Sequence, residues 1–138
     1  MQRQWAFLFA AWMLALGATL GALFIGEIMG QAPCDLCWHQ RAFMFPLAII
    51  LGIAALRNDF EVRNYALPLS FTGGLIAGFH SLLYAGVLPR AIEPCGVGPS
   101  CSSAAMTILG GVPIPYLSAS AFIAITVLLI GTITWRPR

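Results

Sequence analysis

Four long apolar segments, separated by short polar ones, account for most of the chain. They cover residues 5–28, 42–56, 65–88 and 114–135. A helix that crosses the hydrocarbon core of a bilayer needs about 20 apolar residues, and the first, third and fourth segments have that length. The first is also too long for a cleaved signal peptide and lacks a small-residue cleavage site. We therefore expect three of the four segments to be transmembrane helices as they stand.

The second apolar segment is informative because it is short. Residues 42–56 would reach only about 22 Å as a helix, less than the roughly 30 Å of the hydrocarbon core. To span, this helix must begin near Leu36 and include Arg41. The pattern thus predicts an all-α polytopic membrane protein: one domain over residues 1–138, with helices at 5–28, 36–56, 65–88 and 114–135 and two extracytoplasmic loops.

The composition agrees with a chain surrounded by lipid. Charged residues make up 9% and hydrophobic residues 59%, and the mean hydropathy is +0.86. A soluble domain carries roughly 25% charged residues. This chain has too few polar side chains to cover a surface exposed to water, which excludes a soluble domain.

The arginines predict the orientation, because basic residues are enriched in cytoplasmic loops. With four spans, both termini and the loop after the second helix share one side, and that side holds five arginines: Arg3, Arg57, Arg63, Arg136 and Arg138. Arg41 and Arg90 lie on the other side. We expect a multi-pass protein of the inner (cytoplasmic) cell membrane, with both termini cytoplasmic and the cysteines extracytoplasmic.

The four cysteines form two close pairs, in "PCDLCWHQR" and "EPCGVGPSC". They are compatible with two structural disulfides, a four-thiolate metal site or two redox-active pairs. A Cys34–Cys37 bridge closes a very small loop and removes little chain entropy. A zinc site commonly uses two close pairs, but here they lie on separate loops, and the Cys95–Cys101 spacing is wider than usual. Redox exchange is the favoured interpretation.

The surroundings of the first pair also favour exchange. The helix dipole favours a thiolate at a helix N-terminus, and Arg41 adds a cation one turn beyond Cys37. Both make Cys37 the expected thiolate, although the Asp35 carboxylate opposes them. The sequence has no dinucleotide, haem or iron–sulfur motif. This leaves an electron acceptor that dissolves in lipid, such as a quinone, whose reduced ring the Arg41 guanidinium would stabilise.

The chain resembles the DsbB/BdbC family of bacterial disulfide bond formation proteins, which are four-helix membrane thiol:quinone oxidoreductases. "CDLCWHQR" has the family's C-x-x-C-x-x-x-R motif at the start of the second helix, and "PCDLCWHQRAFMFPL" is similar to the short Gram-positive-type members. "GEI", "EPCGVGPSC" and "VPIP" also fit. The resemblance covers nearly the whole chain.

This resemblance implies a role for each cysteine and for Arg41. Cys34 and Cys37 would be the quinone-linked pair, with Cys37 contacting or adding to a ubiquinone or menaquinone that Arg41 binds. Cys95 would form a mixed disulfide with a soluble thioredoxin-fold dithiol oxidase (DsbA/BdbD-like), and Cys101 would then pass electrons to Cys34. The protein would thereby sustain disulfide formation in exported proteins.

Three alternatives remain open from the sequence. His80, inside the third apolar segment, is either part of the quinone site, as the resemblance implies, or a hydrogen-bonded packing residue. A vitamin K epoxide reductase-like quinone reductase would use similar chemistry, but such proteins place C-x-x-C on a late helix. A membrane metal-binding protein would use the four cysteines as ligands.

Overall fold

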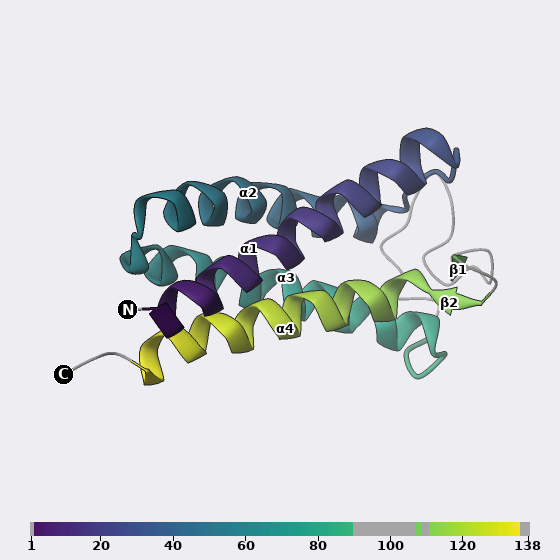
Figure 1. The fold of residues 1–138 in the computed structure, drawn as a ribbon. Helices are drawn as coiled ribbons and strands as arrows, with labels where there is room; N and C mark the ends of the chain where they lie inside the picture. The colour runs from purple at the N-terminus through teal and green to yellow at the C-terminus, as the bar shows by residue number, and fades with distance from the viewer. Residues whose placement is uncertain (1, 90–106, 109–110, 136–138) are drawn as a thin grey trace.

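The protein is a bundle of four long helices (Figure 1). The computed structural model of the chain describes residues 2–89, 107–108 and 111–135. The elements are α1 (Gln2–Leu23), the π-helical turn η1 (Phe24–Ile28), α2 (Asp35–Arg57), the 3-10 turn η2 (Phe60–Val62), α3 (Arg63–Tyr84), the two-residue strands β1 (Thr107–Ile108) and β2 (Val112–Pro113), and α4 (Ile114–Thr134).

The four helices are long and apolar enough to cross a membrane, which confirms the expected fold class. Their ends differ from expectation by a few residues. The third helix was expected to continue to residue 88, but α3 ends at Tyr84. Gly86, at φ +78°, adopts a left-handed conformation that a continuing right-handed helix does not contain.

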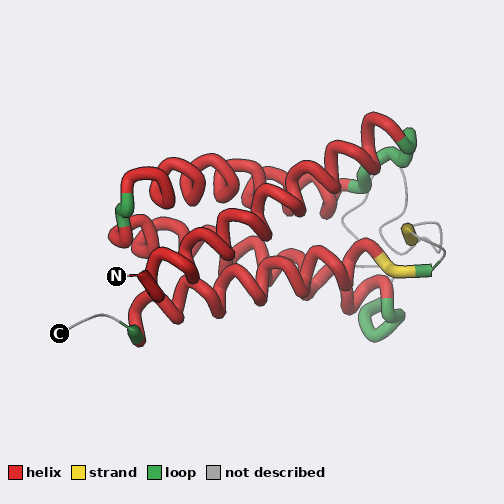
Figure 2. Tube along the Cα trace, in the orientation of Figure 1, coloured by secondary structure: helices red, strands yellow, loops and turns green. Residues whose placement is uncertain are grey.

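Each helix packs against its neighbour in the chain, and α4 closes the bundle against α1. Figures 1 and 2 show both termini and the α2–α3 connection at one end of the bundle. The other end carries η1, the start of α2 and the antiparallel pair β1–β2. The cysteine motif at the start of α2 therefore lies at the end opposite to the termini.

The sharp α2–α3 connection follows from two residues. Asn58, with φ 55°, ends α2 in the left-handed conformation that asparagine tolerates better than most residues. The Asp59 side chain then accepts a hydrogen bond from the backbone N–H of Glu61 and caps η2. The chain reverses within a few residues, so α2 and α3 pack antiparallel.

The core runs along the bundle axis. Its largest fully buried apolar side chains are Leu8, Leu47, Leu51, Phe122, Ile125 and Leu129. The contact between α3 and α4 is close: a Cβ atom on Gly73 would be only 2.3 Å from Cε1 of Phe122. Glycine at this position allows the two helices to approach.

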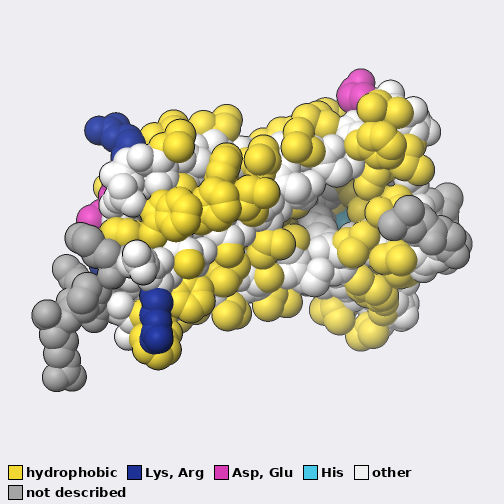
Figure 3. Space-filling model, in the orientation of Figure 1, with side chains coloured by type: hydrophobic (Ala, Val, Ile, Leu, Met, Phe, Trp, Pro, Cys, Tyr) yellow, Lys and Arg dark blue, Asp and Glu magenta, His cyan; other side chains and the backbone are white. Residues whose placement is uncertain are grey.

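Hydrophobic side chains cover the sides of the bundle, as Figure 3 shows for one face. The charged side chains seen on that face lie toward the two ends of the bundle. Among the described arginines, Arg3, Arg57 and Arg63 belong to the end that holds the termini, because they begin α1, end α2 and begin α3. Arg41 is two turns inside α2 at the opposite end.

Candidate functional site

Cys34 and Cys37 face each other at the start of α2. Cys34 is the N-cap residue, with extended backbone, and Cys37 lies in the first helical turn. Their Sγ atoms are 3.3 Å apart and both thiols are free, so the structure shows the dithiol state. Cys34 is buried in a small apolar cluster with Leu36 and Leu83, whereas Cys37 is half-buried. The two sulfurs are close enough to form a disulfide after a small movement.

His80 of α3 reaches the same pair from the neighbouring helix. Its side chain is fully buried, and its Nε2 atom lies 3.8 Å from Sγ of Cys34. On the other side of the ring, the Gln40 amide nitrogen lies 2.9 Å from Nδ1. The Ser118 hydroxyl of α4 donates a hydrogen bond to Oε1 of Gln40. One polar chain thus connects α4, α2 and α3 and ends at the Cys34 sulfur.

This arrangement concentrates hydrogen-bond donors around Cys34. The Cys37 thiol, donating to the Cys34 sulfur, lowers the pKa of Cys34 from its ordinary value to about 5; burial opposes this shift and His80 contributes to it. From the sequence alone, the helix dipole and Arg41 favour Cys37 as the thiolate. In the dithiol state the structure favours Cys34 instead, because direct donors at short range outweigh a more distant cation.

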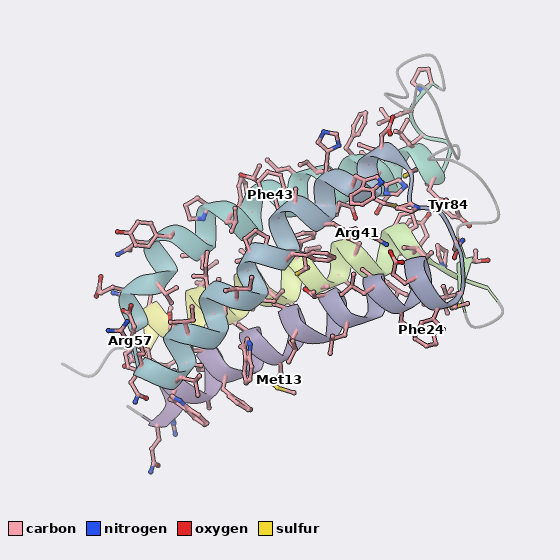
Figure 4. All side chains as sticks on the ribbon, turned by 90° about the horizontal axis from the view of Figure 1, so that it is seen from above. Met13, Phe24, Arg41, Phe43, Arg57 and Tyr84 are labelled. Carbon is pink, nitrogen blue, oxygen red and sulfur yellow. The ribbon has the colours of Figure 1, made fainter. Side chains whose placement is uncertain are left out.

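Arg41 extends from α2 toward the end of α1 (Figure 4). Its Nη2 atom donates a 2.8 Å hydrogen bond to the backbone carbonyl of Ala22. A Cβ atom on Gly26, within η1, would be 3.0 Å from Nη2 and 3.4 Å from Nη1. The guanidinium also lies 5.4 Å from the centre of the Trp38 ring. The end of α1, including its π-helical turn, therefore determines where this cation sits.

A cavity of about 400 Å³ lies between α1, α2 and α4. Its polar lining comes from α2 and α4: Cys37, Gln40, Arg41 and Ser118. The rest is largely apolar and includes Met13, Leu14, Gly17, Gly21, Met44, Phe45, Leu117 and Phe122. Figure 3 shows the surface hollowed between the helices on this face. A small molecule in the cavity would meet the Cys37 thiol, the Arg41 guanidinium, the polar groups of Gln40 and Ser118, and otherwise apolar walls.

The two cysteines differ in their relation to this cavity. Cys37 lines it, whereas Cys34 is not part of the wall and lies behind, against His80. Among the described residues, His80 is not part of the cavity wall, and it contacts Cys34 and Gln40. Gly17 and Gly21 widen the cavity on the α1 side, since a Cβ atom at either position would meet nothing within 4 Å.

The structure brings together four of the six residues that the sequence singled out: Cys34, Cys37, Arg41 and His80. The other two, Cys95 and Cys101, lie outside the described residues. Sequence reasoning missed Gln40, Ser118 and Gly26. The available signal for the first two was a polar side chain within an apolar span, which is costly in a membrane unless it is paired or functional.

The described residues also contain one group that has the chemistry of a metal site. The ligand atoms of Cys34, Cys37 and His80 all lie within 4.8 Å of one another. Two sulfurs and one imidazole are suitable ligands for zinc. The same three side chains would serve thiol exchange, so their proximity alone does not distinguish the two uses.

Comparison with known proteins gives a consistent result. The sequence profile of the family described as "Disulfide bond formation protein DsbB" matches residues 2–132. A "Probable disulfide formation protein" from Metapseudomonas resinovorans is 59% identical over 127 residues, covering 91% of this chain and 88% of that protein. "Disulfide bond formation protein C" from Bacillus subtilis (strain 168) is 40% identical over 129 residues, covering 94% of each. No solved structure was found to match the chain.

Proposed function

The chain belongs to the DsbB family of disulfide bond formation proteins, and from this premise we propose that it is a membrane thiol:quinone oxidoreductase. Its substrate is the dithiol form of a soluble thioredoxin-fold oxidase, and its electron acceptor is a membrane quinone. Family membership indicates a redox role in disulfide formation, and the four apolar helices indicate a membrane protein. The quinone and the partner are the proposed part.

The observation that carries the proposal is that Cys37 and Arg41 share one cavity. The volume of about 400 Å³ is within the range of small-molecule sites. Its walls are mostly apolar and are formed by membrane-spanning helices, as a lipid-soluble ligand requires. The planar guanidinium suits a carbonyl oxygen, and it becomes more favourable when that oxygen gains negative charge. These residues fit a quinone head group.

When bound, a quinone would accept two electrons and two protons. The chain's own residues prepare this transfer. Arg41 would hold a carbonyl oxygen of the quinone, and Cys37 presents its sulfur to the cavity. As the Cys34–Cys37 S–S bond forms and the two S–H bonds are lost, the two electrons and two protons of the dithiol would pass to the quinone. The buried position of Cys34 keeps this nucleophile away from competing reactions with water-soluble oxidants.

The second pair connects this site to the partner. A partner thiolate attacks Cys95 of a Cys95–Cys101 disulfide, Cys101 leaves as a thiolate, and the second partner thiol completes the exchange. Cys101 then attacks Cys34 of the Cys34–Cys37 disulfide and releases Cys37 toward the cavity, after which Cys95 closes on Cys101 and frees Cys34. Family membership and the sequence spacing support these roles.

One experiment tests the proposal directly. The purified, fully reduced protein is mixed with ubiquinone-1 or with a short-chain menaquinone, and quinone loss is followed by its ultraviolet absorbance while free thiols are counted. We expect one quinone reduced for every two thiols lost, and no reduction by Cys37→Ser. A protein that leaves both quinones oxidised, and instead holds one zinc ion per chain on reduced thiols, would be a metal-binding protein.

A further inference from the structure

We propose that Gln40 and Ser118 are positioning residues that hold His80 in one tautomer, with its Nε2–H directed at the sulfur of Cys34. The inference rests on the proposed function, because it explains how the dithiol is prepared for oxidation. Gln40 and Ser118 are uncharged polar residues that line the cavity. The Gln40 amide and the Ser118 hydroxyl act on the cysteine pair through the His80 ring.

The contacts come from three different helices. Gln40 is 6% exposed and His80 is fully buried, so a polar atom left unpaired here would carry a large desolvation cost. The Gln40 amide satisfies both sides at once: its nitrogen lies 2.9 Å from Nδ1 of His80, and its oxygen accepts the Ser118 hydroxyl proton. In the structure the amide is oriented so that its oxygen faces Ser118 and its nitrogen faces the ring.

That orientation determines where the histidine proton resides. The Gln40 amide oxygen is occupied by Ser118, so the amide presents its NH2 group to the ring, and Nδ1 accepts. A neutral imidazole carries one proton on one nitrogen. With Nδ1 accepting, the proton is on Nε2, which lies 3.8 Å from the Cys34 sulfur. The ring thus offers a donor to Cys34 and not an acceptor.

The His80 Nε2–H group thus faces the Cys34 sulfur, which also lies 3.3 Å from the Cys37 sulfur. A donor from the ring favours the Cys34 thiolate over the thiol. A stabilised thiolate is the nucleophile needed to close the disulfide on Cys37, and it also makes the reduced pair more stable relative to the disulfide. In the opposite tautomer, Nε2 would accept a hydrogen bond from the Cys34 S–H group and so favour the thiol.

The first test observes the tautomer. The chain has two histidines, so His39→Gln leaves His80 as the only imidazole, and 15N-histidine NMR of the reduced protein then reports the protonation of each ring nitrogen. We expect Nε2 protonated and Nδ1 bare. Adding Gln40→Leu or Ser118→Ala should give a mixture of tautomers. A protonated Nδ1 in the parent protein, or an unchanged tautomer in both variants, would overturn the proposal.

The second test measures the thiol–disulfide equilibrium of the Cys34–Cys37 pair. It uses a Cys95→Ser/Cys101→Ser background, in which this is the only cysteine pair. Equilibration with glutathione buffers should show the Cys34–Cys37 pair about tenfold harder to reduce in Gln40→Leu and in Ser118→Ala, which corresponds to about 30 mV. Ser120→Ala is the control, because Ser120 is exposed and, within the described residues, its hydroxyl donates only to the Leu117 carbonyl of its own helix. Equal equilibria in all variants would refute the inference. Neither test uses quinone, so a failure of quinone reduction is recognised separately.

Discussion

Arg41 is joined to Ala22 by a 2.8 Å hydrogen bond from Nη2 to the backbone carbonyl. The contact ties the cation of α2 to the end of α1, and so places the guanidinium at the edge of the cavity that Cys37 also lines. One donor is used for this attachment, and a guanidinium has five. Within the described residues this is the only hydrogen bond of Arg41, and Gly26, which has no side chain, leaves room for the guanidinium.

The first prediction concerns the guanidinium itself. Arg41→Ala and Arg41→Met remove both the charge and the donors, whereas Arg41→Lys keeps the charge alone. If a charge-assisted hydrogen bond contributes about 1.5–3 kcal/mol, its loss should weaken quinone use by about 10- to 150-fold. The loss should appear as a higher quinone requirement, with lysine intermediate. Titrating quinone against steady-state thiol oxidation measures this, and equal quinone dependence in all four proteins would make Arg41 an interfacial anchor.

Gly26 provides a second, subtler test of the same site. A Cβ atom there would lie 3.0 Å from Nη2 of Arg41, so Gly26→Ala should displace the guanidinium by a few tenths of an ångström. We expect quinone affinity to fall by about 3- to 10-fold, since small misplacements of a binding group are costly. Gly78→Ala is the matched control: this α3 glycine has nothing within 4 Å of its would-be Cβ and does not line the cavity. An equal loss of quinone affinity in Gly78→Ala would show that the Gly26→Ala effect does not come from displacement of the Arg41 guanidinium.

The third prediction follows from the lowered pKa of Cys34. In a Cys95→Ser/Cys101→Ser background, the ultraviolet absorbance of the thiolate should persist as the pH falls and disappear only near pH 5, because the pKa is about 5. A depressed pKa means that the charged form is present above that value and lost below it. Adding Cys34→Ser should abolish this signal. A thiolate that forms only above pH 8, the behaviour of an ordinary cysteine, would contradict the hydrogen-bonded arrangement.

The fourth prediction concerns the outer cysteine pair. In Cys101→Ser, the Cys95 thiol can still exchange with the disulfide of the oxidised partner, but this chain has no neighbouring thiol to displace it. A covalent complex with a thioredoxin-fold protein should therefore accumulate, visible on gels without reductant and lost on reduction. If Cys95→Ser left partner oxidation intact, the assignment of the exchange pair would be wrong.

The fifth prediction concerns orientation. The arginines of both termini and of the α2–α3 connection favour a cytoplasmic position for that end of the bundle. Alkaline phosphatase, which is active only outside the cytoplasm, should be active when fused within residues 89–113 and inactive when fused after Arg138. The reverse pattern would place the cysteines in a reducing compartment and would exclude the proposed cycle.

The sequence by itself determined the number of spans, the position of Cys34 and Cys37 at the end of the bundle opposite to the termini, and the association of Cys37 with Arg41. These features depend on properties local to one segment. Apolar length decides whether a helix spans, and residues four apart lie on one face of any α-helix. The same local reasoning placed Cys37 and Arg41 in the first two turns of the second helix, where the structure has them.

Only the tertiary structure decided the rest: the contact of His80 with Cys34, the Gln40–Ser118 hydrogen bond across 78 residues of chain, and the cavity between α1, α2 and α4. Each depends on how the helices are rotated about their axes. In a soluble helix an apolar stripe reveals that rotation, but a helix surrounded by lipid is apolar on all sides. The preference for Cys37 as thiolate was reversed for the same reason, because the donors that act on Cys34 come partly from another helix.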